Sequence, residues 1–375
     1  MKYFIACIIL ICLSTERTLS QSVKERLERS LDRLPHPTSV SDFSSLPHLP
    51  SQNQDSTLIC WSFTTTSFIE SEMKRMGKNP VRLSVIFPVY YEFIEKTKEF
   101  VRTKGKSRFN PGDLFSGVLD IVRNYGIVPA AVYEAKEGHY KLNHNALYLE
   151  LESIASAIKM KENWDEKKGI QLVTKVLQKY LGRPPEKFFY NNKEYTPKSF
   201  FSEIVNIPLD DYLCVTSFLY APFRHTIELR VPDNWRHISH YWNVPLDLFY
   251  RSLKQAIIQG YSLAIDMDNS ENSYRITKQF AFIPEYDLPK DSITQIKREI
   301  EFLSGATTDD HLIHIVSYKQ FGSEEWFLAK DSWRTAWEGP NQGYFFLHES
   351  YIKLKVLAFL VHKDAIPKIR MFQQK

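Results

Sequence analysis

Apolar residues recur at helical spacing through the first half of the chain and form short, dense runs towards its end. The clearest helical segment begins at Cys60, because Phe63, Ile69 and Met73 fall near one face and Gly77 follows as a stop signal. We therefore predict a helix that starts at this cysteine.

The rest of the chain divides into a helical region and a strand-rich region. Helical spacing reappears beyond Pro88, and residues 137–187 have a helical and highly charged pattern. Apolar runs predict strands at LCVTSFLY and YSLAIDMD and, further on, at HLIHIVSYKQ, EWFLAKDSW and GYFFLH, with FGSE as a turn. Helices first and strands last favour an α+β fold over a doubly wound sheet.

Composition and missing motifs exclude several classes of function. The 375 residues are 43% hydrophobic, which is enough for one large domain or two small ones. A net charge of +4 without long runs of one sign does not point to a nucleic-acid partner. The chain lacks an HExxH motif, a glycine-rich phosphate loop and a GxSxG motif. Because His237 and His240 lack a third ligand at a fixed offset, we expect neither a metal nor another cofactor.

The first twenty residues have the layout of a secretory signal peptide. A basic start precedes the apolar run Phe4–Leu13, which is too short to span a bilayer, and cleavage is expected after Ser20. A buried N-terminal helix and a lipid-modified Cys12 are alternatives, the second weakened by the bulky Ile11. We expect an exported protein, either periplasmic, secreted or lipid-anchored. No second long apolar run follows, so the mature chain, residues 21–375, should have no transmembrane segment.

Two cysteines remain after removal of the signal. Cys60 and Cys214 either form a disulfide, which would silence both, or stay free. Cys214 lies in an apolar run and is expected to pack as a small hydrophobic residue. Cys60 opens the predicted helix, where unpaired backbone N–H groups lower the pKa of a thiol and favour the nucleophilic thiolate. Trp61 gives it a rigid apolar backing, and Gln54 offers a side-chain amide that could hold an oxyanion.

A cysteine nucleophile also needs a general base with an orienting partner. The segment TTDDHLIHIVSY offers His311, at the start of a predicted strand and expected to be exposed there, and His314, which lies inside the apolar run and is assigned to the core. The orienting acceptor is expected at Asp331.

The ordered residues resemble those of the papain-like cysteine peptidases. The matching positions are Gln54, Cys60, Trp61, Asp310, His311, Asp331, Ser332 and Trp333. The 251 positions from Cys60 to His311 exceed the roughly 130–150 of the papain type. This difference looks like the insertion of the bleomycin hydrolase and aminopeptidase C branch. Further stretches resemble bacterial aminopeptidase C proteins, among them EKFFYNNKEYTPKSF, VPDNW, TTDDHLIHIV and VHKDAIPK.

The resemblance implies a fold, a reaction and an assembly. It implies a papain-like α+β fold, with Cys60 on a helical lobe, His311 and Asp331 on a strand-rich lobe, and a helical insertion at about residues 137–260. It implies a thiol aminopeptidase that hydrolyses N-terminal residues from peptides through an acyl-enzyme, with Gln54 in the oxyanion hole. Peptide substrates are the expected partners. Members of this branch also tend to form homo-hexamers and to bind the substrate amine with their own C-terminal carboxylate.

Four positions near the predicted site depart from the family pattern. Asp331 replaces the usual Asn, and its charge should stabilise the imidazolium of His311. Leu58 and Ile59 replace small residues before the nucleophile, and Arg334 replaces a glycine. The tail IRMFQQK also differs from the family's usual ending. A catalytically impaired peptide-binding protein and a cysteine endopeptidase with an open cleft therefore remain alternative functions.

Overall fold

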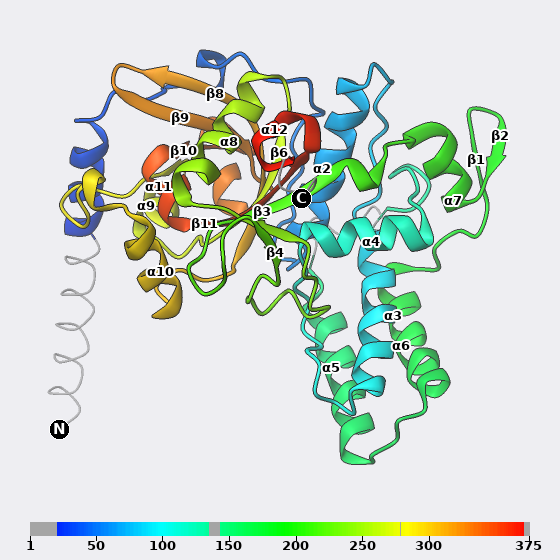
Figure 1. Ribbon diagram of the computed structural model, residues 1–375. Coiled ribbons are helices and arrows are strands. Elements are labelled where there is room, and N and C mark those ends of the chain that lie inside the picture. The colour runs from blue at the N-terminus through cyan, green and yellow to red at the C-terminus, as the bar shows by residue number, and fades with distance from the viewer. Residues whose placement is uncertain (1–20, 135–142, 278, 371–375) are drawn as a thin grey trace, which may run out of the picture.

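The computed structural model describes residues 21–134, 143–277 and 279–370 (Figure 1). One part of the molecule is built around a nine-stranded sheet, and the other consists mainly of helices (Figure 1). The predicted signal peptide, residues 1–20, lies outside the described residues and stays a prediction. No helix in the described ranges has the length and apolar character needed to cross a membrane.

Helix α2 (Cys60–Arg75) packs against both parts and is buried along most of its length. Every residue from Trp61 to Met73 is buried, so this helix packs on all sides. The hydroxyls of Thr65 and Thr66 bond within the helix, the first to the Trp61 carbonyl at 2.7 Å. The predicted start at Cys60 is confirmed, and Gly77 follows the helix with a φ of 74°, a conformation that favours glycine.

The helical part contains four long helices and a small hairpin. These elements are α3 (Ile86–Arg102), α4 (Phe115–Tyr125), α5 (Asn145–Met160), α6 (Glu166–Leu181), β1 (Phe188–Tyr190), β2 (Lys193–Tyr195) and α7 (Pro197–Phe200). Helix α6 packs against both α3 and α5 (Figure 1). The helical pattern predicted for 137–187 is confirmed where those residues are described.

The sheet has the strand order β4-β5-β3-β11-β6-β8-β9-β10-β7, and its strands pair antiparallel except β3 with β5 and β10 with β7. Its strands are β3 (Tyr212–Thr216), β4 (His225–Ile227), β5 (Tyr241–Asn243), β6 (Leu263–Met267), β7 (Phe280–Ala281), β8 (His311–Phe321), β9 (Glu324–Lys330), β10 (Tyr344–His348) and β11 (Val356–His362). All five predicted strands are present, at β3, β6, β8, β9 and β10. Strand β11, which pairs with β3 and β6 in the interior of the sheet, was not predicted.

Different helices cover the two faces of the sheet. Leu312 and Ala358 belong to the core that includes α2, whereas the adjacent Ile313 and Phe359 pack with residues of α8 (Leu246–Ile258), including Phe249. Alternate residues of each strand thus reach opposite cores. The remaining helices are α9 (Asn272–Thr277), α10 (Gln295–Leu303), α11 (Glu349–Lys355) and α12 (Pro367–Arg370). Short 3₁₀ segments occupy Val40–Asp42, Leu209–Asp211, Lys290–Ser292, Arg334–Trp337 and Lys363–Ala365, and Phe201–Val205 form a π-helix.

Strands β3 to β5 and helix α8 join the sheet, although they fall inside the range 137–260 that was predicted to be an insertion. The part of that range up to α7 belongs to the helical lobe (Figure 1).

The segment 229–238, which follows β4, is fastened to the helical part by a buried ion-pair network. Arg236 binds the carboxylates of Glu92, on α3, and Asp113, the latter at 2.7 Å, and both carboxylates are almost fully buried. The indole N–H of Trp235 donates to Glu92 at 2.6 Å, and the ammonium of Lys96 lies 3.6 Å from the same carboxylate. Removing the guanidinium would leave two carboxylates short of a buried counter-charge.

We predict that Arg236→Leu lowers the free energy of unfolding by about 3–5 kcal/mol, because it leaves charged groups uncompensated in the interior. Urea unfolding of the variant and the parent protein measures this change. Arg123→Leu is the matched control: Arg123 pairs with Asp120 and Asp210 at the surface, so its loss should cost no more than about 1 kcal/mol. Equal costs for the two variants would contradict the prediction.

Candidate active site

Cys60 is the first residue of α2, and its side chain is half-buried. Ile59 precedes it as the N-cap and accepts backbone hydrogen bonds from Ser62 and Phe63, so the thiol is placed at the helix end where backbone N–H groups converge. Cys60 and Cys214 are both free, which excludes the disulfide alternative. Cys214 is buried in the core, as predicted, and burial raises the pKa of its thiol.

His311 is the first residue of β8, and its ring is fixed by Asp331. Its Nε2 lies 2.8 Å from Asp331 Oδ1, which leaves Nδ1 as the nitrogen available to a thiol. The expectation that His311 is exposed was wrong, because only 1% of it is accessible. The rings of Tyr274 and Trp333 lie beside the imidazole, with centroids 6.3 and 6.0 Å away.

The charge state of His311 reflects two opposing effects. Burial alone would lower the pKa of His311, but the charge of Asp331 and its hydrogen bond, together with a hydrogen bond and charge from Cys60, raise it to about 10. The ring is therefore protonated at neutral pH. The Cys60 contribution indicates that sulfur and imidazole interact directly.

Asp331 is held in place from three directions. The Trp333 backbone N–H donates to its Oδ1 at 2.7 Å, and the Tyr274 hydroxyl donates to its Oδ2. Its own N–H donates to the Gly343 carbonyl at 3.0 Å. Tyr274, on α9, was missed by the sequence analysis, because nothing in its local sequence marks it as a partner of a residue 57 positions away.

Gln54 lies in the loop before α2 and is tied to the segment that carries Asp331. Its backbone N–H donates to the Ser332 carbonyl at 2.8 Å, and its Oε1 accepts from the Ser332 hydroxyl at 2.5 Å. Its Nε2 donates one hydrogen to the Thr57 carbonyl at 2.8 Å. This leaves a second amide N–H, in a loop that ends at Cys60.

Helix α5 of the helical lobe braces the same loop. The hydroxyl of Thr57 lies 2.7 Å from Nδ1 of His144 and 3.0 Å from the hydroxyl of Tyr148. Tyr148 also bonds the backbone of Leu58, and it lies close enough to Cys60 for that side chain to raise the pKa of the Tyr148 hydroxyl. The sequence analysis missed both partners, because they lie about ninety positions beyond the loop.

The remaining predicted residues are placed as follows. Trp61 is buried and its indole N–H donates to the Pro111 carbonyl at 2.9 Å. Asp310 is exposed beside His311 and accepts from the Asn269 backbone at 3.4 Å. His314 is a core residue, as predicted, with its Nδ1 2.9 Å from the Ser67 hydroxyl.

The substituted positions do not distort the loop. Ile59 is fully buried in the core with a φ of −126°, outside the left-handed region, and Leu58 is largely exposed. Arg334 points away from the interior and pairs with Glu338 at 3.4 Å on the surface.

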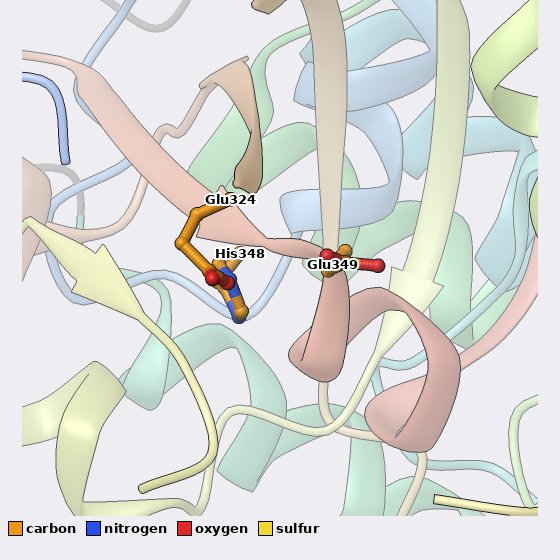
Figure 2. Close-up of side chains that lie close together, drawn as sticks. All are labelled: Glu324, His348 and Glu349. Carbon is orange, nitrogen blue, oxygen red and sulfur yellow. The ribbon is translucent and has the colours of Figure 1, made fainter. Parts of the chain in front are cut away.

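Among the described residues, one group has the spacing of metal ligands. Ligand atoms of Glu324, His348 and Glu349 all lie within 4.8 Å of one another, and Figure 2 shows Glu324 reaching towards the His348 ring. The ammonium of Lys290 lies 3.1 Å from Glu324 and 2.6 Å from Glu349, and His348 Nε2 lies 2.8 Å from Glu324. The Lys290 ammonium therefore already neutralises the carboxylates of Glu324 and Glu349. His237 and His240 are exposed and lie outside this group.

Comparison with known proteins places the chain in a family. Residues 24–374 match the model of the peptidase C1-like family. The chain is 21% identical to aminopeptidase G of Lactobacillus delbrueckii subsp. lactis, covering 93% of this chain and 87% of that protein. It is 23% identical to aminopeptidase C of Lactococcus lactis subsp. cremoris, covering 88% and 85%.

The fold is similar to a solved structure as well. The crystal structure of PepW from Lactobacillus rhamnosis HN001 matches with a TM-score of 0.68 at 18% identity, over 93% of this chain and 86% of that one. The papain-like α+β fold implied by the sequence resemblance is thereby confirmed. Because the family model spans nearly the whole chain, the protein belongs to the peptidase C1-like family of cysteine peptidases.

Proposed function

We propose that the protein is a thiol aminopeptidase that removes N-terminal residues from peptides, with Cys60 as its nucleophile. One observation carries the proposal: His311 is bonded to Asp331 through one nitrogen and interacts with Cys60, which sits at the N-terminus of α2. The relatives named aminopeptidase G and aminopeptidase C support the exopeptidase assignment.

The first half of the reaction forms an acyl-enzyme. The Cys60 thiolate attacks the scissile carbonyl, and a C–S bond forms as the carbonyl electrons move onto oxygen. The second amide N–H of Gln54 and the backbone N–H of Cys60 stabilise that oxyanion. The imidazolium of His311 then donates its Nδ1 proton to the leaving amine, and the C–N bond breaks.

The second half releases the product. His311, now neutral, accepts a proton from water as the water attacks the thioester carbonyl. Collapse of the tetrahedral intermediate expels the Cys60 thiolate and restores the ion pair with His311. Asp331 keeps the ring oriented throughout, and its negative charge favours the imidazolium that exists in the resting state.

Four departures from the family pattern gave reason to expect an impaired site. Leu58, Ile59 and Arg334 take no part in the hydrogen bonds described around Gln54 and His311, and Asp331 accepts the bond that holds the His311 ring. The peptidase is therefore the better supported of the two functions. An endopeptidase differs from an aminopeptidase in accepting substrates whose α-amine is blocked.

The ion pair between His311 and Asp331 makes stability depend on pH. The folded-state pKa of His311, about 10, lies above the unfolded value of about 6.5. Its stabilising contribution is therefore fully present below about pH 6.5 and is lost as pH rises towards 10.

We predict that Cys60→Ala abolishes turnover of aminoacyl fluorogenic substrates, with a loss of at least about a thousandfold. Gln54→Ala should lower kcat by about 10²–10³-fold, because an oxyanion donor is removed. Cys214→Ala is the matched thiol control and should keep the parent kcat.

The same substrates with an N-acetylated α-amine should not be cleaved. Turnover that survives in Cys60→Ala would refute the nucleophile, and efficient cleavage of the N-acetylated substrates would identify an endopeptidase.

We predict that Asp331→Asn lowers the pKa of His311, because the carboxamide keeps the hydrogen-bond acceptor but removes the charge. Nuclear magnetic resonance titration of isotope-labelled histidine reads this pKa directly. In urea unfolding, the stability difference between parent and variant should be greatest near pH 6.5 and should shrink towards pH 10. His240→Gln, which removes an exposed ring, is the control and should leave this pH dependence unchanged. A constant stability difference at all pH values would contradict the assignment of the charge to His311.

A further inference from the structure

Three carboxyl groups gather beside Cys60, on the side of the sheet that faces α2. The Thr64 hydroxyl donates to the Leu312 carbonyl at 2.7 Å, so α2 runs alongside β8. One helical turn earlier, Cys60 lies level with the residues that precede β8, which include Asp309. On the neighbouring strand β6, Asp266 is paired with Leu312, whose side chain packs in the core that contacts Cys60.

Asp266 is fully buried, and within the described residues neither of its carboxyl oxygens is paired with a backbone donor or a cation; the polar side chain that it faces is another acid, Asp309. Asp268, two positions further along the chain and equally buried, does have hydrogen-bond and ion-pair partners. It accepts from the backbone of Ser270 and Thr308, and the ammonium of Lys355 lies 3.5 Å away. The fold therefore supplies donors and a cation to one buried aspartate and neither to the other. A buried carboxylate without partners is destabilising, so its presence calls for a ligand.

Asp309 and Asp233 complete the cluster. The Oδ1 of Asp309 is enclosed without a partner among the described residues, and its Oδ2 accepts from the Asp233 backbone N–H at 3.1 Å. Burial, followed by the charge of Asp233, raises the pKa of Asp309 to about 7. Burial and the neighbouring Asp309 likewise raise the pKa of Asp266. These shifts are those of acidic groups that face one another without a sufficient counter-charge.

The cluster joins the two lobes at the site. Asp233 belongs to the segment 229–238, which Arg236 fastens to the helical lobe, yet it bonds Asp309 of the sheet lobe. Its carboxyl also rests on Gly112, where an added Cβ would come within 1.9 Å of Asp233 Oδ2. Gly112 follows Pro111, whose carbonyl accepts from the Trp61 indole. The Asp233 carboxyl therefore lies next to the segment that contacts Trp61, the residue after Cys60.

We propose that Asp233, Asp266 and Asp309 form a subsite that binds a cationic nitrogen group of the peptide substrate, either its α-ammonium or the side chain of a lysine or arginine. This inference rests on the proposed peptidase function. An ammonium or guanidinium group brings several N–H donors and a positive charge, which are what the unpartnered oxygens of Asp266 and Asp309 lack. Within the described residues, the three carboxyls do not share a single 4.8 Å neighbourhood, which suits an extended multi-donor group better than a metal ion.

The kinetic test compares substrates that differ only in charge. Leucyl coumarylamide is paired with its 2-hydroxy analogue, and arginyl coumarylamide is paired with citrullyl coumarylamide, both of which keep a free α-amine. In Asp266→Asn and Asp309→Asn, kcat/KM for the cationic member should fall at least about tenfold, while the neutral member changes less than about twofold. The pair whose discrimination collapses identifies the cation as the α-ammonium or the side chain. Asp291→Asn, which removes an exposed carboxylate on the 3₁₀ segment Lys290–Ser292, is the matched control and should change neither member.

A binding experiment separates this inference from the proposed reaction. In the Cys60→Ala background, calorimetry should show that a tripeptide with a free α-amine, or an arginine peptide, binds more tightly than its neutral counterpart. Asp266→Asn should remove that preference even if no substrate is ever turned over.

Thermal unfolding supplies the control for a purely structural role. Because Asp266 is paired with no cation and no backbone donor among the described residues and faces a second acid, Asp309, the Tm of Asp266→Asn should equal or exceed that of the parent. A lower Tm accompanied by parallel losses on charged and neutral substrates would overturn the proposal, as would an unchanged preference for the cationic member of every pair.

Discussion

The site depends on the packing of helix α2 along strand β8. Thr64 bonds the Leu312 carbonyl, and Ser67 bonds His314. The two residues of each contact are separated by 248 and 247 positions, respectively, along the chain. Because α2 is buried on all sides, it has no exposed face along which to shift. This packing places the first residue of the helix beside the first residue of the strand, so a sulfur and an imidazole meet although neither element contains both.

Two buried acids near the site show opposite designs. Asp331 is saturated, with His311, Tyr274 and the Trp333 backbone as partners, and it acts as a fixed structural charge. Asp266 is paired with no cation and no backbone donor in the described chain, and the polar side chain that it faces is the acid Asp309. A carboxylate whose oxygens all have hydrogen-bond donors orients the groups around it. A carboxylate without donors orients no neighbouring group until a ligand binds it. This contrast separates the part of the site to which we assign the chemistry from the part that we assign to recognition.

Much of the site could be predicted because its residues fall in short, ordered motifs. Cys60 at a helix start, Gln54 before it, and Asp331 ahead of a tryptophan are all local patterns. The burial of His311 could not be predicted, because it results from Tyr274 and Trp333, which reach it from other elements. The bracing of the Gln54 loop by α5 and the gathering of carboxyls were missed for the same reason. In the fold, amphipathic and apolar runs predicted the helices α2, α3, α5 and α6 and five strands of the sheet. Helices α4 and α8 were missed, as was strand β11, although it pairs on both edges, with β3 and β6.

The contrast between the two free thiols has a practical consequence. Cys214 is enclosed by the core, whereas Cys60 retains access to solvent, and these are the two cysteines of the described chain. In a chain that begins at residue 21, a maleimide dye or a spin label added to the folded protein should therefore attach at Cys60. The stoichiometry of its incorporation would count intact sites in a preparation, and its signal would report directly on the surroundings of that thiol.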